Sequence, residues 1–156
     1  MKTKQFLMAL TALVLIMPAL ASCNSKDEID VSALEGTWYT DLTGKTHFEW
    51  NDGPALNVWT FQVDGTGVCD VFFLADDQPK AIEHQPFTYT IKGKLITFVM
   101  EDSTWDGIVT MAEGKLTIDS GGRAIIFDRA SAEQIARFEA WSKMDLMQVT
   151  PTPTEQ

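Results

Sequence analysis

Hydrophobic and polar residues alternate along most of the chain after residue 34, and short turn signals interrupt the alternation. In the segment 56–63, Trp59 and Phe61 occupy alternate positions, and Val58 and Thr60 take the other set. A repeat of two residues places successive side chains on opposite faces, which is typical of a β-strand with one buried face. The pattern therefore predicts a protein built mainly of strands.

Segments of this kind follow one another at regular spacing, and glycine-containing turns separate several of them. Glycine suits these places because it adopts the positive φ angles of tight hairpins without strain. Short, regularly spaced strands joined mostly by hairpins favour an antiparallel barrel or sandwich over an α/β sheet. The predicted strands are 36–42, 56–63, 68–74, 87–92, 95–101, 105–111, 116–118 and 124–129.

One segment near the C-terminus has the pattern of a helix instead. Ser131 and Gln134 have the spacing of a capping box, in which each side chain bonds the backbone of the other residue. We expect a helix over about 132–144 that lies against the barrel, and a partner-binding helix is the alternative. Residues 147–156 form a polar Pro/Thr tail that we expect to be disordered. The apolar stripe of this helix consists of Ile135, Phe138 and Trp141.

The first 22 residues differ from the rest of the chain. Lys2 and Lys4 precede an apolar run from Phe6 to Leu20, which is the layout of a secretory signal peptide. The run contains Pro18 and is shorter than the roughly 20 residues that a membrane-spanning helix needs. We therefore expect a cleaved signal peptide, in preference to a retained transmembrane anchor.

The segment 20–23, Leu-Ala-Ser-Cys, resembles the bacterial lipobox, in which the cysteine thiol is diacylated and the chain is cut just before it. The resemblance implies a mature lipoprotein that begins at Cys23, because several acyl chains on one residue anchor a protein stably in a membrane. We expect residues 23–33 to form a flexible, lipidated tether. Ser25 and Lys26, followed by acidic residues, resemble the signal that exports lipoproteins of the Bacteroidetes to the cell surface, which implies an exposed position on the outer membrane.

The charge of the chain argues against one class of partner. The full chain has 12 Lys and Arg against 22 Asp and Glu, and loss of Lys2 and Lys4 leaves 10 minus 22, or −12. Phosphate repels so acidic a protein, which argues against nucleic acids and anionic lipid headgroups as partners. With Cys23 lipidated, Cys69 is the only other thiol, so we expect no internal disulfide and a buried Cys69 on a strand.

Several residues together resemble a known family. Gly36 and Trp38 on the first strand, eight up-and-down strands, Arg129 at the end of the last strand and a following helix resemble the lipocalin-like lipoproteins of the Bacteroidetes, relatives of the calycin barrels. The resemblance implies an eight-stranded antiparallel up-and-down barrel with one C-terminal helix over residues 34–146. It also implies that Trp38 closes the barrel floor and that Arg129 packs across the indole, an arrangement that gains cation–π energy.

The resemblance implies a ligand inside the barrel, and the sequence supplies many aromatic side chains to contact it. We expect a small apolar or amphipathic ligand, although an eight-stranded barrel is also narrow enough to be filled by its own side chains. The candidate ligand contacts are Trp59, Phe61, Phe87 and Tyr89, with Trp50 and Trp105 near the rim. The aromatic residues available to fill the barrel instead are Trp59, Phe61, Phe72, Phe73, Phe87, Tyr89, Phe98 and Phe127.

A second interpretation is a cell-surface module that contacts proteins or carbohydrates. Tryptophans in exposed loops provide flat apolar platforms for such partners, and Trp50 and Trp105 are the candidates. Burial of both rings would remove the sequence support for this interpretation.

Motifs of known enzymes do not occur in the sequence. There is no Gly-x-Ser-x-Gly, His-Glu-x-x-His, phosphate-binding glycine loop or Cys-x-x-Cys. The segment 119–121, Asp-Ser-Gly, matches the aspartic-protease triplet once and is explained as a hairpin turn. His47 and His84 would need to converge to bind a metal. We therefore predict a non-enzymatic protein without catalytic residues, metal or other cofactor, with a hydrolase that uses scattered acids as a weaker alternative.

Overall fold

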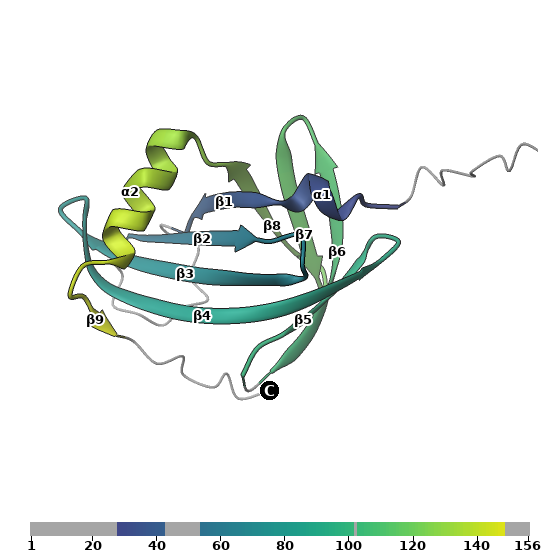
Figure 1. Ribbon diagram of the computed structural model, residues 1–156, viewed down its shortest axis with the longest axis horizontal. Coiled ribbons are helices and arrows are strands. Elements are labelled where there is room, and N and C mark those ends of the chain that lie inside the picture. Colours follow the sequence, from purple (N-terminus) through teal and green to yellow (C-terminus); the bar gives the residue numbers. More distant parts are fainter. Residues whose placement is uncertain (1–27, 43–53, 102, 149–156) are drawn as a thin grey trace, which may run out of the picture.

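The computed structural model describes residues 28–42, 54–101 and 103–148. Eight strands close into a barrel, with a short helix at one end and a longer helix on the outside (Figure 1). The elements in chain order are α1 (Val31–Leu34), β1 (Gly36–Asp41), β2 (Ala55–Phe61), β3 (Thr66–Ala75), β4 (Gln78–Lys92), β5 (Leu95–Val99), β6 (Thr104–Ala112), β7 (Lys115–Ser120), β8 (Arg123–Arg129), α2 (Ala132–Ser142) and β9 (Met147–Gln148).

Each strand of the barrel pairs with its neighbours in the sequence, and β1 also pairs with β8 to close the ring. All of these pairings are antiparallel. The protein is therefore an eight-stranded antiparallel up-and-down barrel of the lipocalin-like kind, and the fold predicted from the sequence is confirmed. The two-residue strand β9 pairs in parallel with β4 at Ala81 and Ile82, in the part of β4 that β5 does not reach.

The two ends of the barrel differ, and we call them the floor and the mouth. The floor is the end at which α1 leads into β1 and Trp38 lies opposite Arg129 on β8. The mouth is the other end, where the β3–β4 hairpin and the β7–β8 turn lie. Figure 1 shows the β3–β4 hairpin at the far end of the barrel from α1.

Alternation along the strands sends every second side chain into the barrel interior. The interior is mainly hydrophobic, and α1 contributes to it through Leu34, which is fully buried. Partly buried side chains, among them Ile29 and Val31, pack against its edge. The buried interior cluster consists of Leu34, Trp38, Ala55, Trp59, Phe61, Cys69, Val71, Phe87, Tyr89, Ile96, Phe98, Val109, Leu116, Ile118 and Phe127.

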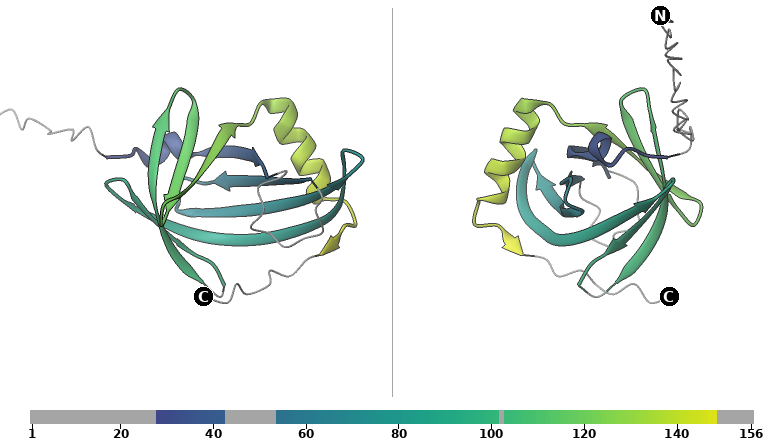
Figure 2. Two further views of the ribbon diagram at one scale, coloured as in Figure 1. Left: turned by 180° about the vertical axis from the view of Figure 1, so that it is seen from behind. Right: turned by 45° about the vertical axis from the view of Figure 1, so that its right-hand side comes forward.

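The helix α2 lies across the outer face of the barrel (Figure 2). Its capping box is present as predicted, with the Ser131 amide donating to Gln134 Oε1 at 2.8 Å and the Gln134 amide donating to Ser131 Oγ at 3.3 Å. The helix ends at Ser142, two residues before the predicted end. The predicted docking of this helix on its own barrel is confirmed by a second buried cluster, which consists of Val58, Phe72, Ile82, Phe138 and Trp141.

The strand β4 is longer than the sequence predicts. It begins at Gln78, whereas the predicted strand begins at residue 87, and it follows a two-residue turn in which Asp76 and Asp77 have φ angles of 52° and 58°. Prolines at 79 and 86 weaken the strand signal, because proline donates no ladder hydrogen bond. Pairing with the whole length of β3 nevertheless keeps this segment extended.

Phe72 does not belong to the barrel interior, in contrast to its place among the residues expected to fill it. Phe72 and Phe73 are adjacent on β3, so only one of them can face inward. Phe73 packs against the interior cluster, whereas Phe72 lies beneath α2 with its ring centroid 6.3 Å from that of Phe138. The register of β3 and β4 shifts between Phe73 and Leu74.

Short regular elements overlap the predicted tether and the predicted tail. Val31–Leu34 lies at the boundary of the predicted tether and forms α1, and Met147–Gln148 at the start of the predicted tail forms β9. The predicted signal peptide, Cys23, His47 and Trp50 lie outside the described residues. Among the residues that the structure describes, no helix is both long and apolar enough to span a membrane.

Candidate functional site

The register of β1 to β4 arranges the inward side chains in rows across the barrel. Thr40 on β1 lies opposite Asn57 on β2, Asn57 lies opposite Val71 on β3, and Val71 lies opposite Glu83 on β4. We call these four residues the mouth-side row. All four are at most 9% exposed, and three of them carry polar side chains.

Large aromatic rings follow on the floor side of this row. Trp59 is at their centre, with its ring centroid 5.1 Å from those of Phe87 and Phe98 and 5.8 Å from those of Phe61 and Phe127. We call these five residues the aromatic layer. Each of them is at most 5% exposed, so the layer divides the interior into a mouth half and a floor half.

The structure brings together the four ligand contacts predicted from the sequence. Trp59, Phe61 and Phe87 are members of the aromatic layer, and the ring centroid of Tyr89 lies 5.4 Å from that of Phe61. The Tyr89 hydroxyl donates to the carbonyl oxygen of Gln62 at 2.6 Å, which ties this side chain to the floor side of the barrel. Trp59 is the predicted contact that borders the mouth-side row directly, because it is two positions from Asn57 on β2.

Of the two predicted rim tryptophans, the structure describes Trp105. Its ring is stacked on that of Phe98, with centroids 4.3 Å apart, and lies edge-on to Trp59 at 5.9 Å. Trp105 is partly buried and packs against the interior cluster. One face of this indole is thus already in contact with the barrel interior.

Trp38 and Arg129 meet at the floor. The guanidinium carbon of Arg129 lies 4.9 Å from the centroid of the Trp38 ring, within the range of a cation–π contact. Arg129 also donates to the carbonyl oxygens of Ala33, at 3.3 Å, and of Glu35. The indole nitrogen of Trp38 donates to the carbonyl oxygen of Leu34 at 2.8 Å. These contacts fasten α1 across the floor.

Asn57 connects the mouth-side row to the aromatic layer. Its Oδ1 accepts a hydrogen bond from the indole nitrogen of Trp59 at 2.8 Å and one from the Cys69 thiol at 3.3 Å. A buried amide with two such bonds has a fixed orientation. Asn57 was not among the residues singled out from the sequence.

Glu83 is the acidic residue of the mouth-side row, and it is 9% exposed. Among the described residues, its carboxylate has no hydrogen bond or ion pair. Burial raises the pKa of Glu83, and no partner offsets this effect. Every fully enclosed polar side-chain atom of the described residues is hydrogen-bonded, so the unbonded oxygens of Glu83 retain some contact with solvent.

Cys69 faces the interior beside Glu83, and its expected burial is confirmed. Its pKa is raised well above 9.0, first by burial and then by the negative charges of Glu83 and Asp70. The thiol is therefore protonated at neutral pH and unreactive as a nucleophile.

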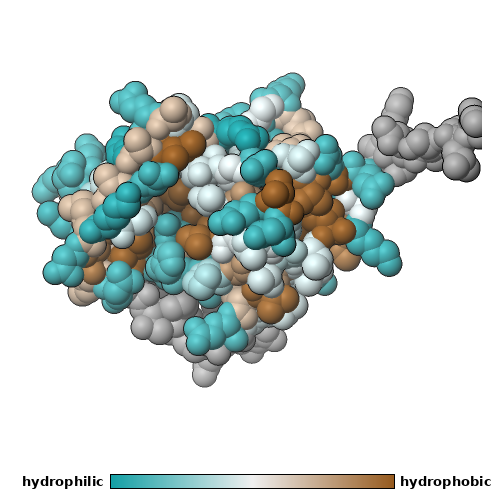
Figure 3. Space-filling model, in the orientation of Figure 1, coloured by the Kyte–Doolittle hydropathy of each residue, from teal (hydrophilic) through white to brown (hydrophobic). Residues whose placement is uncertain are grey.

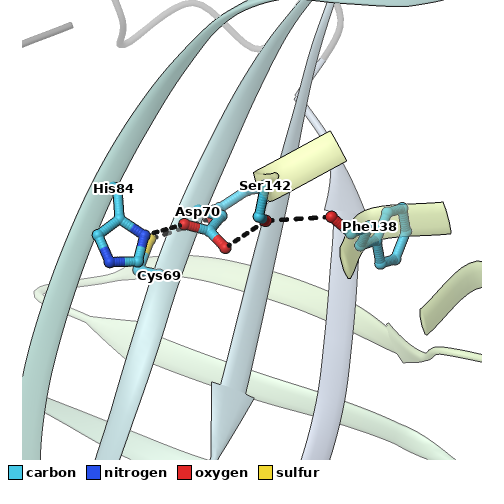
Figure 4. Close-up of polar contacts among 6 residues, drawn as sticks. Cys69, Asp70, His84, Phe138 and Ser142 are labelled. Carbon is cyan, nitrogen blue, oxygen red and sulfur yellow. Dashed lines mark hydrogen bonds and ion pairs between the residues drawn. The ribbon is translucent and has the colours of Figure 1, made fainter. Parts of the chain in front are cut away.

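A separate polar cluster lies on the outer surface beneath the end of α2. His84 Nδ1 is 2.6 Å from Asp70 Oδ1, and Ser142 Oγ is 3.4 Å from the other oxygen of Asp70 and 3.0 Å from the carbonyl oxygen of Phe138 (Figure 4). The carboxylate lies between the imidazole and the hydroxyl. A serine nucleophile would need the imidazole as its own partner, so the cluster fits attachment of α2 to the barrel.

The aspartic-protease triplet at residues 119–121 is part of a hairpin turn. Asp119 accepts a hydrogen bond from the Gly122 amide at 2.9 Å in the β7–β8 turn, and Gly121 and Gly122 have positive φ angles. The described residues contain no group of three or more His, Cys, Asp or Glu that could hold a metal ion.

No protein-family model matches the chain, and no curated protein matches it. The lipocalin-like description therefore rests on the barrel itself, with its sequential strands, its floor and its outer helix.

Proposed function

We propose that this protein is a lipid-anchored, non-enzymatic barrel that binds one small amphipathic molecule in the mouth half of its interior. The observation that carries the proposal is the contrast between the two halves. The floor half is filled by aromatic rings in mutual contact, whereas the mouth-side row consists of small and polar side chains, with the rings of Phe73 and Trp105 at its edges.

Side-chain size explains why the ligand would lie in the mouth half. Ala55 and Ala81 both lie opposite Phe73, next to the mouth-side row, and Thr40 and Val71 within that row are also small. A closed barrel of eight strands has room either for its own side chains or for one small ligand. Large rings fill the interior below Trp59, whereas these four side chains above it are small and Phe73 is the large ring beside them.

Polar groups inside the barrel support the proposal of a binding site. Their burial costs folding free energy, and contact with a ligand would explain why they are placed there. Asn57 recovers part of this cost through two hydrogen bonds, whereas Glu83 has none within the described chain. A desolvated ionisable group in an interior site is a common feature of binding and catalytic centres. An apolar surface next to such groups suits an amphipathic ligand.

The lipid anchor would orient the mouth away from the membrane. Glu28, which precedes α1 at the floor, is five positions after Cys23, and five steps along the chain span at most about 18 Å. Hydrophobic side chains gather on the surface around α1, at the same end of the molecule (Figure 3). A floor held near the bilayer would leave the mouth open to molecules that arrive from outside.

Native mass spectrometry of the full chain, extracted from its host in mild detergent, tests the binding proposal. We expect a bound mass that organic extraction removes. Val71→Phe, which enlarges a side chain of the mouth-side row, should remove that mass, and Thr90→Phe on the exposed outer face of β4 should retain it. A bare mass, with no uptake from a mixture of lipids and metabolites, would contradict the proposal.

Replacement of Cys23 tests the anchor separately. Cys23→Ser should abolish incorporation of a labelled fatty acid and release the protein from membranes, whereas Cys69→Ser should leave the lipid in place. Labelling that survives Cys23→Ser would disprove lipidation at this residue. Digestion by protease added to intact cells tests surface exposure, and deletion of residues 26–28 should protect the protein if the export signal acts as proposed.

A further inference from the structure

We infer that Glu83 holds the ligand and that the ligand carries a cationic nitrogen, such as a primary ammonium group, on an apolar body. This inference rests on the proposed function, since it names the ligand class for the same interior site. It comes from the surroundings of one buried carboxylate, which has no hydrogen-bond or ion-pair partner among the described residues.

The position of Glu83 is fixed by the barrel. Its neighbours on β4, Ile82 and His84, face outward toward α2 and toward Asp70. Glu83 itself lies opposite Val71 and faces inward with 91% of its surface covered, that is, 100% minus the exposed 9%. Long pairing of β3 with β4 on one side leaves this strand no freedom to turn the side chain outward.

The described groups that surround Glu83 leave its charge uncompensated. Val71 is apolar, Cys69 has a protonated thiol, and Asn57 uses its carbonyl oxygen to accept from Trp59 and Cys69. Arg129 is occupied at the floor, on the other side of the aromatic layer. The described interior thus offers Glu83 no cationic partner.

A cationic ligand would supply the missing charge. Attraction between opposite charges strengthens as the effective dielectric constant falls, so an ammonium group gains more at this site than at the surface. A neutral hydroxyl group would bond the carboxylate without balancing its charge, and a carboxylate ligand would be repelled. The mature net charge of −12, from 10 basic and 22 acidic residues, also favours the approach of cations over anions.

The aromatic side chains suit the remainder of such a ligand. Trp59 borders the mouth-side row, and Trp105 lies edge-on to it with centroids 5.9 Å apart. Indole faces attract cations, and indole edges and faces pack well against alkyl chains. The site thus combines one acidic group with an apolar wall.

Three ligands with the same alkyl chain test the inference on the full protein. We would measure binding of octylamine, octanol and octanoate by isothermal titration calorimetry and by quenching of tryptophan fluorescence. Wild-type protein should bind octylamine at least ten-fold more tightly than the other two. Glu83→Gln should abolish this preference, Glu83→Asp should keep part of it, and Glu101→Gln, which removes an exposed charge, should leave it unchanged.

The outcomes separate the inference from the proposed function. Equal binding of the three ligands, unaffected by Glu83→Gln, would overturn the inference and leave an interior ligand site. A bound mass that native mass spectrometry identifies as uncharged or anionic would do the same. Failure of all three ligands, together with a bare native mass, would overturn both. Binding of sphinganine, measured in place of octylamine, distinguishes the two sources of the amine. Tighter binding of sphinganine than of octylamine would indicate an amine derived from membrane lipid, and weaker binding would indicate a soluble amine.

Discussion

The floor half and the mouth half of the barrel differ in the size of their side chains and in how their polar groups are bonded. In the floor half, aromatic rings contact one another and the polar groups of Trp38, Tyr89 and Arg129 bond backbone carbonyls. In the mouth half, the side chains of the mouth-side row are small or polar, and Glu83 is buried without a partner among the described residues. Packing in one half can stabilise the fold enough to tolerate an unfavourable charge in the other. Under the proposed function, stability comes from one end of this small barrel and binding from the other.

Removal of the central ring should have the largest effect. Trp59→Ala would delete a side chain that contacts five other rings, and we expect the free energy of unfolding to fall by about 3–5 kcal/mol. Urea unfolding measures the change. Trp105→Ala is the matched control at the mouth side, and its loss should be smaller because Trp105 is only partly buried. Equal losses would mean that the two halves do not differ in packing.

Gly67→Ala should cost somewhat less. A methyl group at this position would lie 2.3 Å from Cζ of Phe87 and 2.6 Å from the carbonyl oxygen of Thr60, and a backbone oxygen cannot move aside easily. We expect a loss of about 1–3 kcal/mol in the free energy of unfolding. Gly107→Ala should cost less, since its closest contact, at 2.8 Å, is the side-chain Cγ2 of Ile118. Thermal unfolding of both variants checks this order.

Loss of the floor cation should have a moderate effect. Arg129→Gln would remove the contact with the Trp38 ring and weaken the bonds to the carbonyls of α1, at a cost of about 1–2 kcal/mol. Amide hydrogen exchange should show faster opening of α1. Arg123→Gln removes the same charge at an exposed position near the mouth and should leave both quantities unchanged.

Glu83→Gln should have the smallest effect and the opposite sign. At pH 7 the substitution removes a buried charge, so the free energy of unfolding should rise by an amount on the order of 1 kcal/mol. The pKa of Glu83 is raised above its ordinary 4.5 in the folded protein. As the pH falls through the folded pKa toward 4.5, the folded protein takes up a proton first, and the unfavourable contribution of the charge disappears.

The gain from Glu83→Gln should therefore shrink as the pH falls and vanish below 4.5, which urea unfolding at several pH values measures. Glu101→Gln at an exposed position should change stability little at any pH. A loss of stability at pH 7 on Glu83→Gln would show that the carboxylate has a structural partner. That result would remove the contrast between the two halves of the barrel.

Much of this architecture follows from local signals in the sequence. Alternation with a period of two placed Trp59 and Phe61 on one face, and the capping box at Ser131 fixed the start of α2. Such signals are readable because they depend on residues close together in the chain. They also explain the correct order of the strands, since hairpins join neighbours.

Other features depend on contacts between distant strands. The first half of β4 lacks a clear strand signal and is extended because β3 pairs with it, and Phe72 faces outward because α2 covers that side. Alternation puts Asn57 on the face of Trp59 and Phe61, but its hydrogen bonds to Trp59 and Cys69 appear only in the folded barrel. Glu83 precedes the predicted strand 87–92, so no local signal gave it a face before the pairing with β3 placed it inside. Residues near one another in the chain are enough to predict the strands, the helix cap and a barrel. The residues that share the mouth-side row are known only from the folded barrel, because strand register and ring closure depend on the whole sheet.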